Sequence, residues 1–97
     1  MIYEMANIDI LQGKEMDFEA AVAQALPLFH RARGCKGVAL HRTVEQPNHY
    51  LLLVQWETIE DHMVHFRESE DFQTWRSLTG PCFEKPPVVT HTQVAVQ

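Results

Sequence analysis

The chain has 97 residues, 45% hydrophobic and 22% charged, which is the composition of one globular domain over residues 1–97. The formal net charge is −5 with no basic cluster, so the sequence disfavours nucleic acid and anionic membranes as partners. No apolar run approaches the ~20 residues that a membrane span requires. The first residues also lack the pattern of a signal peptide, and we therefore expect a cytoplasmic protein.

In the first half of the chain, the hydrophobic pattern predicts a strand, a helix and a second strand. Residues 2–11 alternate loosely between apolar and polar positions, which is typical of a strand. Residues 18–29 place apolar side chains at helical spacing, Pro27 is expected to kink or break this helix, and Gly34 is expected to follow its end. Residues 35–45 predict the second strand.

The second half of the chain repeats this order. Residues 50–56 predict a strand that forms a hairpin with the preceding one, and its apolar run suggests a cover on both faces. Helix is predicted over 59–67, and Ser69 is expected to cap a second helical segment over 70–78. The valine-rich residues 88–96 predict the last strand. The side chains expected to point inward from the predicted helix 59–67 are Ile59, Met63 and Phe66.

The resulting order β-α-β-β-α-β predicts a ferredoxin-like α+β fold, a four-stranded antiparallel sheet with both helices on one face. The opposite face would keep apolar side chains from residues 51–54 and from the valine-rich last strand. An uncovered apolar face of that size is unusual in a monomer. We therefore expect a homodimer that packs sheet against sheet around a two-fold axis.

Six histidines and two cysteines suggest a metal site, but their spacing argues against one. Cys35 and Cys82 are too far apart for a CxxC site, and we expect free thiols in a reducing compartment. His62 and His65 are three residues apart on a predicted helix, but no Glu-x-x-His or His-x-x-x-His pattern accompanies them. We therefore predict no bound metal. Two further histidines lie within predicted strands, where they could line a pocket or the dimer core: His41 and His91.

Aromatic residues gather in the second half of the chain and could line a cavity between the helices and the sheet. Core packing is the simpler interpretation of any single ring, whereas the set as a whole suits a pocket for a flat aromatic ligand. Asn7 places an amide within a strand, where a ligand oxygen is one candidate partner. The candidate ring residues are Trp56, Phe66, Phe72, Trp75 and Phe83, with Phe29 from the first helix.

Several stretches, in order and spacing, resemble a known family. They are Arg33-Gly34-Cys35, Val54-Gln55-Trp56-Glu57-Thr58 followed by Asp61, His65, Phe66, Ser69 and Phe72, then Gly80-Pro81-Cys82-Phe83 and Pro86-Pro87-Val88-Val89. Together they resemble the antibiotic biosynthesis monooxygenase (ABM) domain family over nearly the whole chain. The resemblance implies a dimeric α+β barrel in which each protomer holds a pocket between its sheet and its helices.

The resemblance also implies an activity. Characterised relatives oxidise polycyclic phenols or quinols with O₂ and need neither flavin nor metal. A deprotonated hydroquinone or anthrone can itself reduce O₂, so the protein needs only to bind the ring, take a proton and stabilise the anion. On this basis we predict a cofactor-independent monooxygenase with His65 as the base and Asn7 as the donor to the developing oxyanion. The aromatic residues would form the walls.

This site depends on two conditions. His65 and Phe72 are seven residues apart and share a helical face only if the helix continues through Ser69. Asn7 must point from the first strand toward the helices, and the sequence does not determine which face of that strand meets the helices.

Two alternatives to this activity are kept. Haem-degrading relatives carry an Asn on the first strand, then a Trp and a His in the second helical region. Asn7 matches. However, this chain has His65 where those relatives carry the Trp and Trp75 where they carry the His, which argues against haem ligation by that histidine. The other alternative is a non-catalytic dimeric barrel that binds a small hydrophobic ligand.

Overall fold

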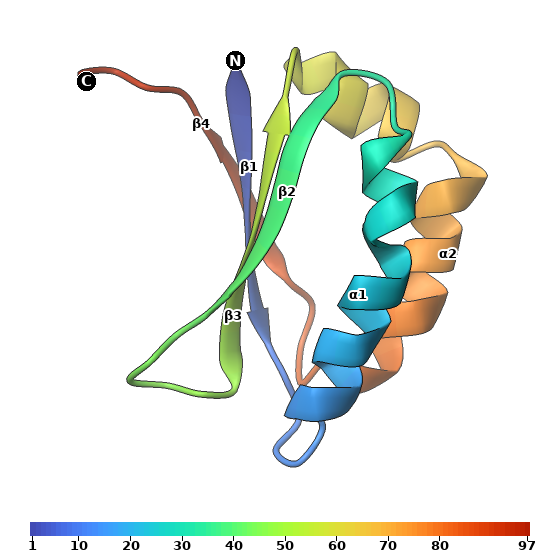
Figure 1. Cartoon of the computed structure of the whole chain (residues 1–97), viewed down its shortest axis with the longest axis vertical. Coiled ribbons are helices and arrows are strands. Elements are labelled where there is room, and N and C mark those ends of the chain that lie inside the picture. Colours follow the sequence, from blue (N-terminus) through green and yellow to red (C-terminus); the bar gives the residue numbers. More distant parts are fainter.

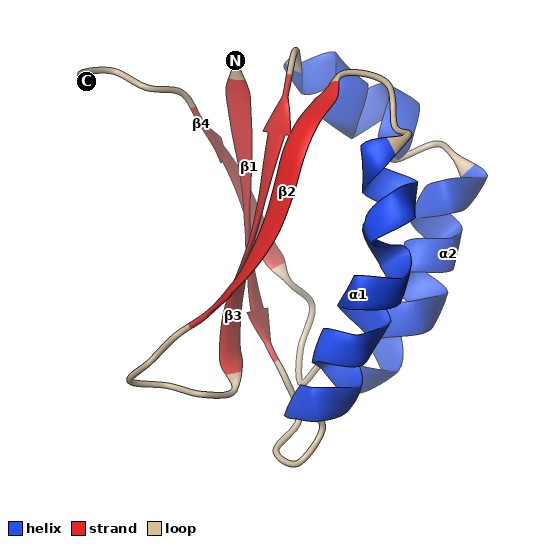
Figure 2. Cartoon of the chain, in the orientation of Figure 1, coloured by secondary structure: helices blue, strands red, loops and turns tan.

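The computed structural model describes all 97 residues, and the four strands form one antiparallel sheet with the helices on one face (Figures 1 and 2). The strand order is β2-β3-β1-β4, which is the ferredoxin-like arrangement, so the predicted fold is confirmed. In chain order the elements are β1 (Ile2–Asp9), α1 (Glu15–His30), β2 (Cys35–Arg42), β3 (His49–Trp56), the π-helix η1 (Asp61–Phe66), α2 (Glu70–Thr79), the 3₁₀ turn η2 (Gly80–Cys82) and β4 (Val88–Thr92).

The alternation of side chains along β1 decides which residues face the helices. Ala6 and Ile8 are buried, whereas Asn7 between them is exposed. Glu4 has the same parity as Ala6, and it too is buried on the helix-covered face. The odd-numbered side chains of β1, Asn7 among them, therefore lie on the helix-free face.

The core lies between the sheet and the helices. Trp56 and Tyr50 from β3 are fully buried and meet Phe18 and Phe29 from α1, which are also sequestered from solvent. Burial of an aromatic side chain of this size stabilises a fold by about 1.5–3 kcal/mol. A cavity with both apolar and polar lining lies farther along the sheet, under α2.

The helix α1 runs through Pro27, so the expectation of a break there is wrong. Pro27 lies in the last turn of the helix and is exposed. Because proline has no backbone N–H, the helix lacks one hydrogen bond there but continues to His30. The amide of Arg31 still donates to the carbonyl of Pro27 at 3.1 Å, which continues the helical pattern. Gly34 follows with φ of +77°, as the sequence predicted for the residue after the helix.

The segment after β3 differs most from the prediction. Ile59 and Met63 are about 40% exposed, and Asp61 and His62 point inward with Phe66. The cause is the π-helical turn of η1, in which the Arg67 amide donates to the carbonyl five residues back and so shifts the helical phase.

The helical segment does not continue through Ser69, whose backbone is extended with φ of −89° and ψ of 159°. Its hydroxyl instead accepts from the amide of Phe72 at 3.2 Å, so the predicted N-cap of α2 is confirmed. The seven-residue spacing between His65 and Phe72 therefore carries no common helical face.

Three strands are shorter than predicted. β1 ends at Asp9, two residues before the predicted end. β2 ends at Arg42, and Val44 beyond it is 88% exposed. β4 ends at Thr92, and the residues after it leave the sheet toward the C-terminus (Figure 1). None of the helices combines the length and the apolar character needed to cross a membrane.

Candidate active site

A cavity of about 500 Å³, which we call the inner cavity, lies between the helix-covered face of the sheet and α2. Glu4, Ala6 and Ile8 of β1 contribute to its floor, and Phe72 and Trp75 of α2 contribute to its wall. Half of its lining is hydrophobic, and a few polar groups converge on it. This volume and this lining are typical of a site for a small aromatic molecule.

Three ionisable side chains, Glu4, His62 and His91, lie in contact with one another at the floor. Trp56 Nε1 donates to Glu4 Oε1 at 3.0 Å, and His62 Nε2 lies 3.2 Å from the same oxygen. His62 Nδ1 lies 2.8 Å from His91 Nε2. Glu4 and His62 are 5% and 3% exposed, whereas His91 on the edge strand is half-buried. These contacts therefore lead from the cavity to the edge of the sheet.

The fold itself brings these groups together. Glu4 and His91 face each other in the β1–β4 register. The ring of His62 stacks on Trp56 with centroids 5.3 Å apart and an interplanar angle of 13°. The π-turn of η1 points His62 inward, so β1, β3, β4 and η1 all position this one cluster.

One oxygen of Glu4 has no hydrogen-bond partner within the protein. The Trp56 hydrogen bond and the His62 contact both involve Oε1. No fully buried side-chain nitrogen or oxygen in the molecule lacks a hydrogen-bond partner, so Oε2 is not fully buried. Glu4 also lines the inner cavity.

Burial sets the charge of this cluster. Desolvation raises the pKa of Glu4 to about 7, although the Trp56 hydrogen bond and the charge of Arg67 oppose it. Desolvation lowers the pKa of His62 to about 4, and it lowers the pKa of His91 as well. Near neutral pH, His62 is therefore a neutral imidazole, and Glu4 populates both its forms. A carboxylate poised near neutrality is suited to general base catalysis.

His62 connects Glu4 to His91. Its Nδ1 lies within hydrogen-bond distance of His91 Nε2, and its Nε2 lies 3.2 Å from Glu4 Oε1. Because either ring nitrogen of a neutral imidazole can carry the proton, His62 can present an N–H or a lone pair to Glu4.

Asn7 and His65 do not meet. Asn7 lies on the helix-free face, where its side-chain oxygen is 3.1 Å from His49 Nε2. His65 is exposed on η1. The predicted cavity shared by these two residues is therefore wrong, because the strand parity and the π-turn place them on different sides of the molecule.

The predicted aromatic residues divide into two groups. Phe72, Trp75 and Phe83 line the inner cavity, and their contact with a substrate stays a prediction. Phe29 and Phe66 pack in the core with ring centroids 5.0 Å apart. A third ring, Trp56, is fully buried in the core and donates a hydrogen bond from Nε1 to Glu4.

The sequence contained a signal for the residues that it did not identify. Glu4 interrupts the parity of Ile2, Ala6 and Ile8, and a carboxylate at an apolar position is informative. His91 likewise shares parity with Val89, which lines the inner cavity. The sequence singled out His62 only as a possible metal ligand beside His65, because its inward direction depends on the π-turn. No group of three or more His, Cys, Asp or Glu side chains is placed to hold a metal ion, and Cys35 and Cys82 are free.

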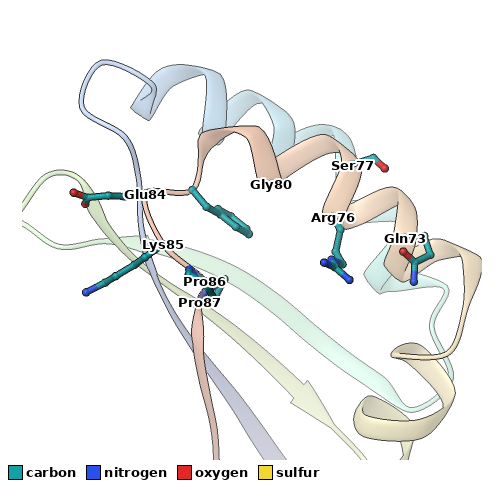
Figure 3. A pocket seen from close by; sticks show the side chains of 9 residues that line it. Gln73, Arg76, Ser77, Gly80, Glu84, Lys85, Pro86 and Pro87 are labelled. Carbon is teal, nitrogen blue, oxygen red and sulfur yellow. The ribbon is translucent and has the colours of Figure 1, made fainter.

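A second hollow of about 710 Å³, which we call the outer cleft, adjoins the inner cavity (Figure 3). The two share Gln73 and Arg76 of α2, Phe83, Pro86 and Pro87. In Figure 3, Gln73 and Arg76 point from α2 into the cleft, while Glu84 and Lys85 point away from α2. The outer cleft is larger but mostly polar, so the inner cavity is the better candidate for the chemistry.

With this geometry established, the chain can be compared with known proteins. The family model of the antibiotic biosynthesis monooxygenases matches residues 1–78. The chain belongs to the antibiotic biosynthesis monooxygenase family. The ABM resemblance inferred from the sequence is thus confirmed.

Relatives in this family cover almost the whole chain. A solved structure from Bordetella bronchiseptica, assigned to the antibiotic biosynthesis monooxygenases, is 59% identical, with a TM-score of 0.96 over 98% of this chain and 97% of that one. The uncharacterised Bacillus subtilis protein YczJ is 39% identical over 96% of this chain and 98% of its own length. SnoaB from Streptomyces nogalater, a cofactor-independent oxygenase, is 14% identical with a TM-score of 0.84, over 99% of this chain and 94% of that one, and shares the fold.

Proposed function

We propose that this ABM-family protein is a cofactor-independent monooxygenase that oxidises a quinol-like or polycyclic phenolic molecule with O₂. The observation that carries the proposal is Glu4, a buried carboxylate that lines an aromatic-walled cavity and whose pKa is raised to about 7. The activity named for SnoaB, which shares this fold, supports the same class of reaction.

The reaction needs one proton acceptor and no electron carrier. Glu4 takes a proton from the substrate, and the delocalised anion reduces O₂ and combines with it as a peroxide. For a ring methylene between aromatic rings, the O–O bond of this peroxide then breaks. The second hydrogen of the methylene carbon leaves with the outer oxygen as hydroxide, and the carbon keeps the inner oxygen as a ketone. Glu4 returns its proton to the hydroxide to form water. The substrate supplies all the electrons, so the atoms and charges balance without a cofactor.

The surrounding residues serve this proton transfer. Phe72, Trp75 and Phe83 hold the flat ring, and their exclusion of water strengthens the contacts of the anion. Trp56 donates to Glu4 Oε1 and His62 lies against the same oxygen, so Oε2 is left for the substrate. His62 acts through Glu4 and is a positioning residue.

An oxygen electrode with a panel of anthrones and naphthohydroquinones tests the proposal. Glu4→Gln keeps the shape of the side chain and removes the base, so we expect kcat to fall by about 10²–10⁴-fold. His65→Ala and Asn7→Ala are the matched controls, because they remove the two residues that the sequence favoured. We expect both to retain activity. Loss of activity in His65→Ala with full activity in Glu4→Gln would return the catalytic role to His65.

We also propose that the protein acts as a homodimer through the helix-free face of its sheet. Tyr3, Met5, Leu51 and Leu53 lie on this face and are only partly buried. No helix covers them (Figure 2). A second copy of the chain would remove this apolar surface from water.

The free thiols of Cys35 and Cys82 support a cytoplasmic location for the enzyme.

A further inference from the structure

Two arginines at the inner cavity have no acidic partner. Neither Arg67 nor Arg76 forms an ion pair, and both line the inner cavity. Every other basic residue of the chain lies within 4.0 Å of a carboxylate. These residues are Lys14, Arg31, Arg33, Lys36, Arg42 and Lys85. The chain has 13 acidic residues against 8 basic ones, so a shortage of carboxylates does not explain the exception.

The two guanidinium groups share one aromatic ring. Arg67 lies 5.5 Å from the ring centroid of Phe72, and Arg76 lies 5.9 Å from it. Phe72 itself lines the inner cavity. Both arginines are exposed, so an anion that approaches the cavity can reach them. Guanidinium groups bind oxyanions through paired hydrogen bonds, which makes arginine well suited to this task.

The acidic side chain beside the cleft does not serve as that anion. Glu84 lines the outer cleft but points away from α2 in Figure 3, and it forms no ion pair with Arg76. Arg67 does influence the inner cavity, because its charge opposes the rise in the pKa of Glu4.

We propose that the substrate carries an oxyanion substituent, a carboxylate or a phosphate, that binds Arg67 and Arg76 while its rings lie in the inner cavity. This inference rests on the proposed function and names its substrate class. Arg76 lines both hollows, so the substituent would lie where the inner cavity meets the outer cleft. Gln73 lines both hollows as well and can add a neutral hydrogen bond.

Calorimetric titration of the full chain with three matched compounds tests this proposal: 1-naphthol, 1-hydroxy-2-naphthoate and 1-naphthyl phosphate. We expect at least one oxyanion compound to bind about tenfold or more tightly than naphthol at low salt, as charge-assisted hydrogen bonds predict. The two oxyanion arms show which substituent fits.

The variant Arg67→Gln/Arg76→Gln should lose this preference and keep its affinity for naphthol. Retained naphthol binding shows that the variant folds and that its cavity is intact. Lys36→Gln is the control for charge, because Lys36 pairs with Glu57 and lines neither hollow. It should keep the preference.

Equal affinities in the native chain, a preference that survives in the double variant, or no binding of any compound would overturn the proposal. Its failure is distinct from failure of the proposed function. Oxygen consumption with a neutral quinol and no preference for oxyanions overturns the substrate class alone. A preference for oxyanions without oxygen consumption on any quinol overturns the monooxygenase proposal alone.

Discussion

Glu4 occupies a position that an alternating strand normally gives to an apolar side chain. Its neighbours on the same face of β1, Ala6 and Ile8, are buried core residues. A carboxylate there must be desolvated, and its hydrogen bond from Trp56 offsets only part of that cost. Because an apolar residue would complete the core, retention of a carboxylate points to chemistry rather than to stability.

Glu4→Gln should make the stability of the fold less sensitive to pH. The folded-state pKa of Glu4 is raised from 4.5 to about 7, so this group destabilises the native chain progressively as pH rises through that window. The variant lacks this effect. Its free energy of unfolding relative to the native chain should increase by a few kcal/mol between about pH 5 and about pH 8. Urea unfolding at several pH values measures this difference.

His62 acts in the opposite direction but does not confuse the comparison. Its folded-state pKa is lowered from 6.5 to about 4, so the stability it contributes is lost as pH falls through that range. This contribution is common to the native chain and the variant and largely cancels in their difference. A difference that stays constant with pH would contradict the buried position of Glu4.

Some of the residues predicted from the sequence as wall residues lie at the inner cavity, namely Phe72, Trp75 and Phe83. Their contact with a substrate stays a prediction. The polar residues of the site were predicted wrongly. The prediction placed the amide of Asn7 in the cavity, whereas the side chains of β1 that face the helices have the opposite parity and include the carboxylate of Glu4. Which parity faces the helices depends on tertiary packing, and the alternation of a single strand does not contain that information.

Among the elements, η1 does most to position the site. Its π-turn points His62 toward Glu4 and leaves His65 in solvent. A hydrophobic pattern read at the period of an α-helix gives the wrong inward face for such a turn, which is why Ile59 and Met63 were predicted as core residues. The capping role of Ser69 was predictable because a capping side chain acts locally.

Gly34→Ala should disturb η1 and destabilise the fold. The residue has φ of +77°, and a Cβ there would overlap the carboxylate of Asp61 at the start of η1. Gly13→Ala is the matched control, because Gly13 has φ of +91° but no atom near its Cβ position. The control should lose about 1 kcal/mol from backbone strain alone, and Gly34→Ala should lose about 1–3 kcal/mol more from the overlap. Urea unfolding compares them, and equal losses would show that η1 does not pack as described.

For the whole molecule, the topology was the most predictable feature. The order of the elements and the right-handed crossover rule leave few arrangements, and the observed sheet is the expected one. The ends of β2 and β4 were not predictable, since their outer residues keep a strand-like pattern but find no partner strand. The helix-free face follows directly from the topology.

Leu53→Lys should convert the proposed dimer to a monomer. Leu53 lies on the helix-free face of a central strand, opposite Met5 of β1 and Ala39 of β2. An unpaired charge buried there must be desolvated, at a cost of several kcal/mol. Val44→Lys is the control, because Val44 is 88% exposed beyond the sheet. Sedimentation velocity measures the mass, and a native chain that is already a stable monomer at micromolar concentration would contradict the proposal.

The pH dependence of oxygen consumption tests most directly the claim that Glu4 takes the substrate proton. The measurement is kcat/KM for a quinol or anthrone whose own pKa lies well above the range studied, because this ratio reports the free enzyme's essential groups. The native rate should rise with pH through a midpoint near the pKa of about 7 held by Glu4. In Glu4→Gln the rate should be low and the midpoint absent. A native profile without this midpoint, or one that persists in Glu4→Gln, would contradict the account.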